Sequence, residues 1–328
     1  MTIEQKIRNE FKRNNELTVK ELVYRTSASK QMIHLVLKKM VAEKHLEKLG
    51  RTPKTVYRLL NDSEKSKKAI VLPNVSESQK EILNNNFLLI TETGNLIEGI
   101  EAFDYWCKKR NLPTLKTLAE FIKTKEKYGV YYDKKGVING TTKLVKTYQK
   151  KTYLNEVYYL DFYAIERFGK TRLGTLLHFA KQGQNLYLMN ILMKEIHDKI
   201  ITFVKDNNID AVGFVPPTIR REIQIMKFIQ ENLNIALPIL DIKKISGIIP
   251  VPQKSLAKLD ERITNAENTF AVTDQRQFNK ILLIDDAVGS GSTLNQIAEK
   301  IKAKKVAKKV IGLAIVGSFK GFDVITDI

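Results

Sequence analysis

Residues 280–296 constrain this chain more than any other part of its sequence, and they read KILLIDDAVGSGSTLNQ. Four consecutive apolar residues, 281–284, stand between polar neighbours, which is typical of a strand buried on both faces of a parallel sheet. Asp285 and Asp286 follow at once, so this strand brings two carboxylates to its C-terminal end, where open α/β sheets bind their ligands. The stretch therefore predicts an α/β domain with a ligand site at this strand end.

The residues after the carboxylates predict an anion-binding loop. Residues 289–293 read GSGST, and small residues allow several backbone N–H groups to converge on one anion. A helical pattern follows, whose N-terminus adds partial positive charge. Its apolar residues are Leu294, Ile297, Ala298 and Ile301. The loop lacks the lysine of a Walker A loop and the third glycine of a dinucleotide fingerprint. The alternative is an ordinary strand–turn–helix corner with a chance Asp-Asp pair.

This pattern resembles the phosphoribosyl-pyrophosphate (PRPP) motif of type I phosphoribosyltransferases. The match rests on Asp285, Asp286, Ser290, Gly291 and Thr293. The resemblance implies that Asp285 and Asp286 are catalytic carboxylates that organise the ribose and hold Mg²⁺, and that the loop binds the 5-phosphate. The implied phosphate-binding residues are Ala287, Val288, Gly289, Ser290, Gly291, Ser292 and Thr293. Gly289 replaces the commoner Thr and the nearby Asp of purine-specific members, which disfavours purine salvage.

The chain around this motif alternates strand and helix patterns. We expect strands at 158–163, 210–215, 236–240 and 310–316, and helices at 172–197 and 219–232. Alternation with short turns favours a parallel sheet covered by helices through right-handed crossovers. The predicted fold class is therefore multidomain, with a C-terminal α/β parallel sheet over residues 156–328, and the resemblance of the motif implies that this domain has a phosphoribosyltransferase fold.

Several further landmarks resemble the ComF-like branch of that fold, a family linked to DNA uptake. They are Tyr163, Lys181-x-Gly183, Val215-Pro216-Pro217, Gln253-x-x-Leu256, Arg262 and Asn265-x-x-x-x-Phe270. The resemblance implies a pyrophosphate site at Pro217, Thr218, Arg220 and Arg221, and a flexible closing loop that carries Lys254 and Arg262. The four-cysteine zinc element of that family is absent, because Cys107 is the only cysteine, and its R-G-F-N-Q run is replaced by I-R-R-E-I-Q. A role in DNA uptake is weakened accordingly.

The N-terminal residues 1–61 predict a winged helix-turn-helix domain (α+β). Thr18 and Glu21 have the spacing of a capping box, and a third helix carries a stripe of apolar residues, namely Met32, Ile33, Val36, Leu37 and Met40. A hairpin with a basic turn follows. By resemblance to that family, the third helix would enter the DNA major groove. The predicted DNA-binding residues are Ser27, Lys30, Gln31, His34, Lys38, Arg51 and Lys54. A protein-interaction module with a solvated basic helix is the alternative.

The residues between these two domains are less informative. Residues 62–84 are polar and charged and predict a linker, and residues 85–155 predict a small mixed α/β middle segment. Tyr128, Tyr131 and Tyr132 lie among lysines and could stack on nucleotides, but packing in an aromatic core is the favoured interpretation. No catalytic pattern is evident in residues 85–155.

Composition limits the class of protein. The formal net charge is +19, which favours polyanionic partners and nucleic acid above all, although a generally lysine-rich composition would produce the same excess. Residues 1–60 hold 14 Lys and Arg against 6 Asp and Glu. No apolar run is long enough for a membrane span and no signal peptide is evident, so a cytoplasmic protein without membrane partners is expected. Whether it forms a homodimer stays open.

The sequence thus leads to three hypotheses. The first is a protein that binds PRPP and Mg²⁺ in its C-terminal domain and double-stranded DNA through its winged helix, with phosphoribosyl transfer as an open question. The second is a PRPP-sensing transcription regulator without catalysis, by analogy only. The third is a ComF-like accessory of DNA processing.

Overall fold

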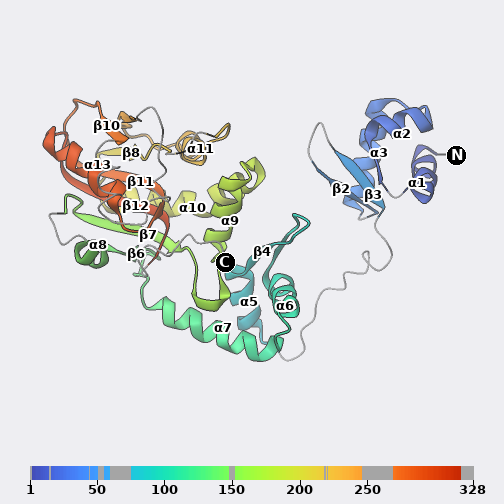
Figure 1. Ribbon diagram of the computed structural model, residues 1–328, viewed down its shortest axis with the longest axis horizontal. Coiled ribbons are helices and arrows are strands. Elements are labelled where there is room, and N and C mark those ends of the chain that lie inside the picture. The colour runs from blue at the N-terminus through green and yellow to red at the C-terminus, as the bar shows by residue number, and fades with distance from the viewer. Residues whose placement is uncertain are drawn as a thin grey trace. The chain divides into compact units, whose positions relative to one another are not determined.

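The computed structural model describes residues 2–14, 16–43, 45–50, 55–59, 75–147, 152–217, 219, 221–245 and 269–318. It is a mixed α/β structure with one five-stranded, mostly parallel sheet and smaller antiparallel sheets. The chain divides into two compact units, which we call unit 1 (Met1–Pro73) and unit 2 (Asn74–Ile328). Figure 1 labels the elements of both units, and each unit is described by itself.

The described residues of unit 1 form three helices and a three-stranded antiparallel sheet in the order β1-β3-β2. Its elements are α1 (Ile3–Arg13), β1 (Glu16–Leu17), α2 (Val19–Thr26), α3 (Lys30–Ala42), β2 (Leu46–Leu49) and β3 (Val56–Leu59). The predicted capping box is confirmed, because the Thr18 hydroxyl accepts a hydrogen bond from the Glu21 N–H and the Glu21 carboxylate accepts one from the Thr18 N–H. β1 was not predicted, since two residues carry no pattern of their own.

A small core holds unit 1 together. Ile7 and Phe11 of α1 pack with Ile33, Leu37 and Met40 of α3, all fully or almost fully buried. The predicted apolar stripe on α3 is wrong at Met32, whose side chain is 44% exposed. Met32 lies about 100° around the helix from the buried Ile33, farther from the centre of the core-facing side than Val36, which still packs against this core.

The sheet of unit 2 has the order β6-β7-β12-β11-β8. Its strands are β6 (Ile138–Asn139), β7 (Glu156–Phe162), β8 (Ala211–Phe214), β11 (Phe278–Val288) and β12 (Ala307–Gly317). The four strands from β7 to β8 are parallel, and only the short edge strand β6 runs antiparallel. β11 is therefore a central strand, and residues 281–284 are fully buried as predicted.

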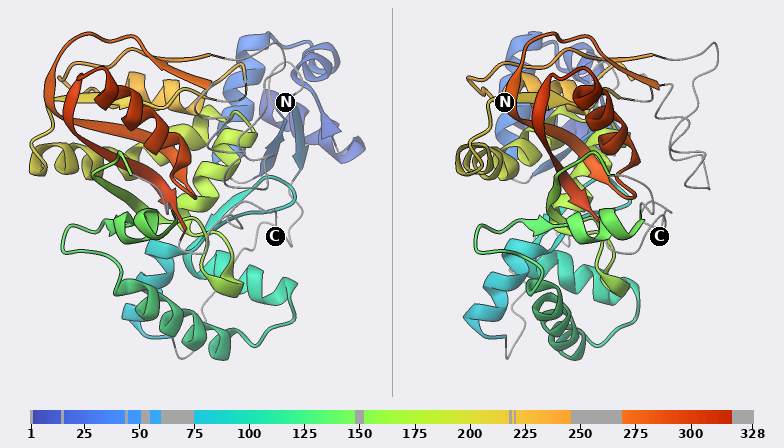
Figure 2. Two further views of the ribbon diagram at one scale, coloured as in Figure 1. Left: turned by 60° about the vertical axis from the view of Figure 1, so that its left-hand side comes forward. Right: turned by 90° about the vertical axis from the view of Figure 1, so that its left-hand side faces the viewer.

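Helices cover both faces of this sheet. α9 (Arg172–Gln182) and α10 (Leu186–Asp206) share one core with the strands, which includes Leu176, Leu192 and Ile284. α13 (Ser292–Ala303) lies on the opposite side of the sheet from α10 (Figure 2). All four predicted apolar residues of α13 are buried. This arrangement places the two carboxylates in the last residues of β11, and the small-residue loop between the end of β11 and the start of α13.

Three sequence-based boundaries in unit 2 were wrong. The expected helix 172–197 is two helices, because Gln184 adopts a left-handed conformation and Asn185 caps the second helix. The expected helix 219–232 begins only at α11 (Ile225–Asn232). The expected strand 236–240 is reduced to one bridge between Ile239 and Val212. In each case the apolar pattern continued through residues whose backbone conformation breaks the element.

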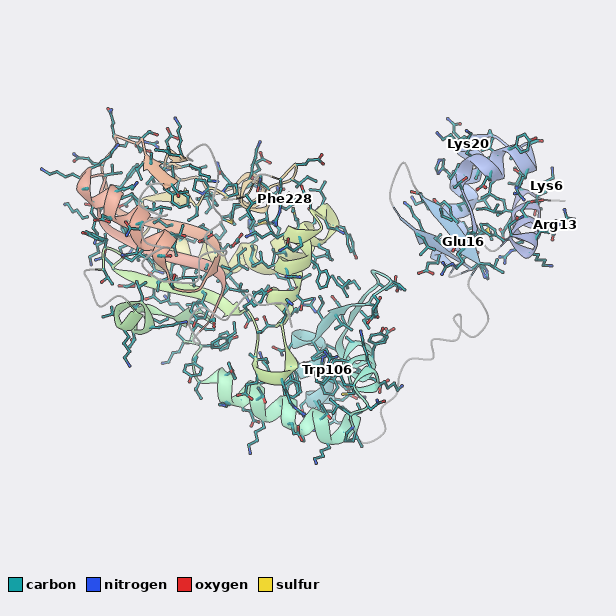
Figure 3. The ribbon with its side chains drawn as sticks, in the orientation of Figure 1. Lys6, Arg13, Glu16, Lys20, Trp106 and Phe228 are labelled. Carbon is teal, nitrogen blue, oxygen red and sulfur yellow. The ribbon has the colours of Figure 1, made fainter. Side chains whose placement is uncertain are left out.

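Residues 75–147 complete unit 2. They form α5 (Glu77–Asn86), a hairpin of β4 (Leu88–Ile90) and β5 (Leu96–Glu98), α6 (Gly99–Lys109), α7 (Thr114–Gly129) and α8 (Thr141–Thr147). Figure 1 shows α5, α6 and α7 gathered in one group. Most of α5 lies within residues 62–84, so the linker prediction is wrong where this helix forms. Trp106 (Figure 3) lies in an aromatic cluster with Phe87, Phe103 and Phe168.

The predicted packing of tyrosines in an aromatic core is confirmed for two of the three residues. Tyr128, Tyr131 and Tyr132 all pack edge-on against Phe162. Tyr128 and Tyr132 are partly buried, whereas Tyr131 is 48% exposed and lies at the edge of the cluster. Cys107 is buried and free. The remaining elements are a short 3-10 helix (Glu166–Phe168) and the antiparallel pair β9 (Ile242–Lys244) and β10 (Phe270–Val272). No helix in the described parts of the chain is both apolar enough and long enough to cross a membrane.

Candidate functional site

The two adjacent carboxylates at the end of β11 have different surroundings. Successive side chains of a strand alternate between its faces, and Leu282 and Ile284 belong to the core shared with α9 and α10. Asp286 continues this series, is buried, and forms an ion pair with Lys181 of α9. Asp285 has the opposite parity and is only partly buried, and its carboxylate accepts a hydrogen bond from the Asp286 N–H at 2.8 Å. The Asp286 carboxylate therefore has a counter-charge within the protein, namely the Lys181 ammonium.

The loop between β11 and α13 is shaped for close approach of a ligand to the backbone. Gly291 is the N-cap of α13 and has φ +77°. Residues other than glycine rarely adopt this left-handed backbone conformation. The Ser290 and Ser292 hydroxyls lie 3.0 Å apart and both are buried, and the Ser292 N–H points to Ser290 Oγ at 3.4 Å. A Cβ atom at Gly289 would meet no atom within 4 Å, so the space above this residue is open. Open space at Gly289 therefore adjoins two serine hydroxyls near the start of a twelve-residue helix.

α13 is fixed to the sheet by one buried amide. Asn295 is 1% exposed, and its side-chain oxygen accepts hydrogen bonds from the Tyr153 N–H (2.7 Å) and the Leu154 N–H (3.1 Å). These residues lead directly into β7. The helix N-terminus, and with it the loop, is thereby held in register with the strands, which is what a preorganised binding site requires.

The C-terminal end of α9 joins the carboxylates to the predicted pyrophosphate region. Lys181 contacts Asp286, and the next residue, Gln182, accepts a hydrogen bond from the Arg221 guanidinium at 2.8 Å. Gln184 accepts a further hydrogen bond from the Ile223 N–H at 2.9 Å. The structure thus connects Arg221 to the residue that follows Lys181 in the chain, and Pro217 is exposed. Lys181 was noted in the sequence only as a helix end, and no local pattern showed that it meets Asp286, 105 residues away.

A second cation near the loop was also missed. Lys143 and Leu144 of α8 line a small cavity together with residues 288–291 of the loop, Tyr159 of β7 and Ser318. The Lys143 ammonium donates a hydrogen bond to the Ser318 carbonyl, and burial lowers the pKa of Lys143 to about 8. A lysine within a lysine-rich stretch gives no signal of such a position, because the contact joins segments almost 150 residues apart.

In unit 1, the predicted DNA-binding residues that the structure describes are exposed. Ser27 ends α2 in a left-handed conformation, and Lys30, Gln31, His34 and Lys38 follow on the outer side of α3. Lys30 and Lys38 form no ion pair with any described residue, whereas Lys39 pairs with Glu4 at 3.0 Å. Lys6, Arg13 and Lys20 are further exposed cations on α1 and after β1 (Figure 3). α3 therefore presents uncompensated positive charge beside groups that can hydrogen-bond to bases.

Several predicted site residues lie outside the described residues. They are Thr218 and Arg220 of the pyrophosphate region, Lys254 and Arg262 of the closing loop, and Arg51 and Lys54 of the wing. Within the described ranges, no three His, Cys, Asp or Glu side chains gather as a metal site. Asp285 and Asp286 still fit Mg²⁺ of the kind that one or two carboxylates share with substrate phosphates, since such an ion keeps most of its ligands from water and substrate.

Comparison with known proteins identifies no family for this chain. No protein-family model matches this chain, and no curated protein matches its sequence. The functional argument therefore rests on the geometry of these residues.

Proposed function

We propose that unit 2 is a phosphoribosyltransferase-like domain that binds PRPP together with Mg²⁺. The observation that carries this proposal is the corner between β11 and α13. There, two carboxylates at the end of a buried parallel strand are followed within five residues by Gly291 at φ +77° and the N-terminus of α13. Carboxylates suit ribose hydroxyls and Mg²⁺, and the loop with its helix N-terminus suits a phosphate monoester.

Each group has a defined part in this proposal. The backbone N–H groups and hydroxyls of residues 289–293 bind the 5-phosphate. Asp285 and Asp286 accept hydrogen bonds from the ribose hydroxyls and would hold Mg²⁺, which when bound neutralises charge on the pyrophosphate. Lys181 supplies the counter-charge of Asp286, and Arg221 extends the positive charge toward the pyrophosphate.

Isothermal titration of the full chain with PRPP in the presence of Mg²⁺ tests the proposal. We expect saturable binding to wild type, weakened about tenfold to hundredfold by Asp286→Asn, as expected for loss of a hydrogen bond to a charged group. Asp198→Asn is the matched control, because the Asp198 side chain is 96% exposed. Absence of binding, or equal binding by the Asp286→Asn protein, would overturn the proposal.

Whether the domain transfers the phosphoribosyl group is a separate question. In such a transfer the bond between C1 and pyrophosphate breaks, a nucleophile of the acceptor bonds to C1, and pyrophosphate leaves. Pyrophosphate release measured over a panel of nitrogenous bases distinguishes an enzyme from a sensor. Release with one base that Asp286→Asn abolishes would establish transfer, whereas binding without release would establish a PRPP sensor or an accessory protein.

A second candidate function concerns unit 1. We propose that its three helices and antiparallel hairpin act as a winged helix that binds double-stranded DNA through α3. Lys30 and Lys38 support this proposal, because they are exposed and form no ion pair within the part of unit 1 that the structure describes, and phosphate neutralisation dominates DNA affinity. A mobility shift with random duplex, repeated at two salt concentrations, tests it, and the addition of PRPP to the same assay tests coupling between the two functions. The absence of a mobility shift at low salt would overturn the proposal that unit 1 binds DNA.

A further inference from the structure

α8 is fixed firmly beside the phosphate loop. The Gly140 N–H donates to the Val157 carbonyl at 2.8 Å, and the Thr141 hydroxyl accepts from the Val157 N–H at 3.0 Å, so the start of α8 is bound to β7. Further along the helix, Leu144 lies against Gly291, because a Cβ atom at position 291 would be 2.5 Å from a Leu144 methyl group. These contacts hold α8 beside the loop. Because Lys143 belongs to α8, they also place Lys143 near the loop.

Among the residues that the structure describes, no carboxylate is paired with Lys143. The cavity that it lines is completed by the loop, Leu144 and the neutral groups of residues 140, 157, 159 and 318. Its hydrogen bond to the Ser318 carbonyl occupies one of the three donors of an ammonium group. Desolvation lowers its pKa to about 8. A partly buried ammonium is unfavourable unless an anion compensates it.

We propose that Lys143 binds the phosphate held by residues 289–293, so that α8 completes the 5-phosphate site of unit 2. This inference rests on the proposed function and deepens it by naming a cationic ligand from a segment in which the sequence showed no catalytic pattern. The ligand class is a ribose 5-phosphate monoester. The loop supplies N–H and O–H donors, and Lys143 supplies the positive charge that these donors lack.

The proposal requires a specific pattern of ligand preference. Lys143→Gln removes the charge and keeps a hydrogen-bond donor on a side chain that is one bond shorter. We expect it to weaken binding of ribose 5-phosphate and of PRPP about tenfold to hundredfold, and to leave the binding of pyrophosphate with Mg²⁺ unchanged. Lys146→Gln, on an exposed residue of the same helix, is the control and should bind all three ligands as wild type does.

The pH dependence of affinity distinguishes a charged Lys143 that binds the ligand from a Lys143 with a merely structural role. A structural role would leave this pH dependence unchanged. Phosphate monoesters are fully ionised above about pH 7.5, and Tyr159, the other titratable residue that lines the cavity, is held neutral because burial raises its pKa. Wild-type affinity for ribose 5-phosphate should fall about tenfold to thirtyfold between about pH 7 and about pH 9.5, as Lys143 loses its proton. Lys143→Arg keeps its charge over this range and should show a flat profile.

The outcomes separate the two proposals. If wild type binds neither PRPP nor ribose 5-phosphate, the proposed function and this inference are both overturned. If wild type binds both, but the Lys143→Gln and Lys143→Arg proteins share its affinity and its pH profile, only the role of Lys143 is overturned.

Discussion

The ammonium of Lys181 and the carboxylate of Asp286 form an ion pair that joins the C-terminal end of α9 to the end of β11. Their side chains are 27% and 11% exposed, so the pair is partly withdrawn from water. A cation or hydroxyl that approaches Asp286 has to share this carboxylate with Lys181. Ligand binding and the packing of α9 are therefore coupled through one carboxylate.

Substitution of one partner of this ion pair should lower the free energy of unfolding more than substitution of both partners. We expect Lys181→Met to lower the free energy of unfolding by about 1–3 kcal/mol, because it leaves the Asp286 carboxylate without its partner, and the double variant Lys181→Met/Asp286→Asn to recover part of the loss. Urea unfolding followed by tryptophan fluorescence reports unit 2 selectively, since Trp106 is the only tryptophan. Additive losses in the double variant would argue against coupling.

Gly291 and Gly289 should respond differently to the same substitution. Gly291→Ala places a side chain at φ +77° and against Leu144, so we expect a loss of about 1–3 kcal/mol of unfolding free energy. Gly289→Ala meets open space and should change stability by less than about 0.5 kcal/mol. Thermal unfolding of the two variants checks this, and equal losses would contradict the described loop geometry.

Lys143 should make stability depend on pH. Its pKa is about 8 in the folded protein, against an ordinary value of 10.5, so between these values the unfolded chain binds more protons and the free energy of unfolding rises with pH. Below about pH 8 both states are protonated and the desolvation penalty is fully present. The stability of wild type relative to Lys143→Gln should therefore increase from about pH 8 to about pH 10.5. A constant difference across this range would show that the lysine is well solvated.

Cys107 should be unreactive in the folded protein. Burial raises the pKa of its thiol to about 11, which lowers the reactive thiolate population about 100-fold from that of a thiol with pKa 9. Labelling with a thiol-specific disulfide reagent should be slow in buffer and rapid in denaturant. Equal rates in both conditions would place Cys107 at an accessible surface.

Lys30 and Lys38 should contribute to DNA affinity through charge alone. Substitution of either by Ala should reduce the slope of log affinity against log salt by about 1, with equal effects on all duplex sequences. Lys39→Ala is the matched control, because Lys39 is already paired with Glu4. A larger effect from Lys39 than from Lys30 or Lys38 would move the DNA-binding face away from the outer side of α3.

Local patterns predicted the centre of the candidate site and missed what long-range contacts add to it. Three of its parts follow from patterns only a few residues long, and the structure contains all three. They are the apolar run 281–284, the small residues 289–293 and the apolar stripe of α13. Lys143 and Lys181 reach the same region only through the pairing of β7 and the packing of α9. Such contacts depend on the whole sheet, so a single sequence gives no periodicity or spacing that would reveal them.

The contact between Leu144 and Gly291 also limits how this protein can vary. A bulkier residue at either position would push α8 away from the loop, and a smaller one at 144 would leave a gap above the backbone of Gly291. Natural selection on the loop is therefore selection on α8 as well. In related chains we expect these two positions to covary, so that the segment before β7 is inherited together with the loop rather than exchanged as an independent module.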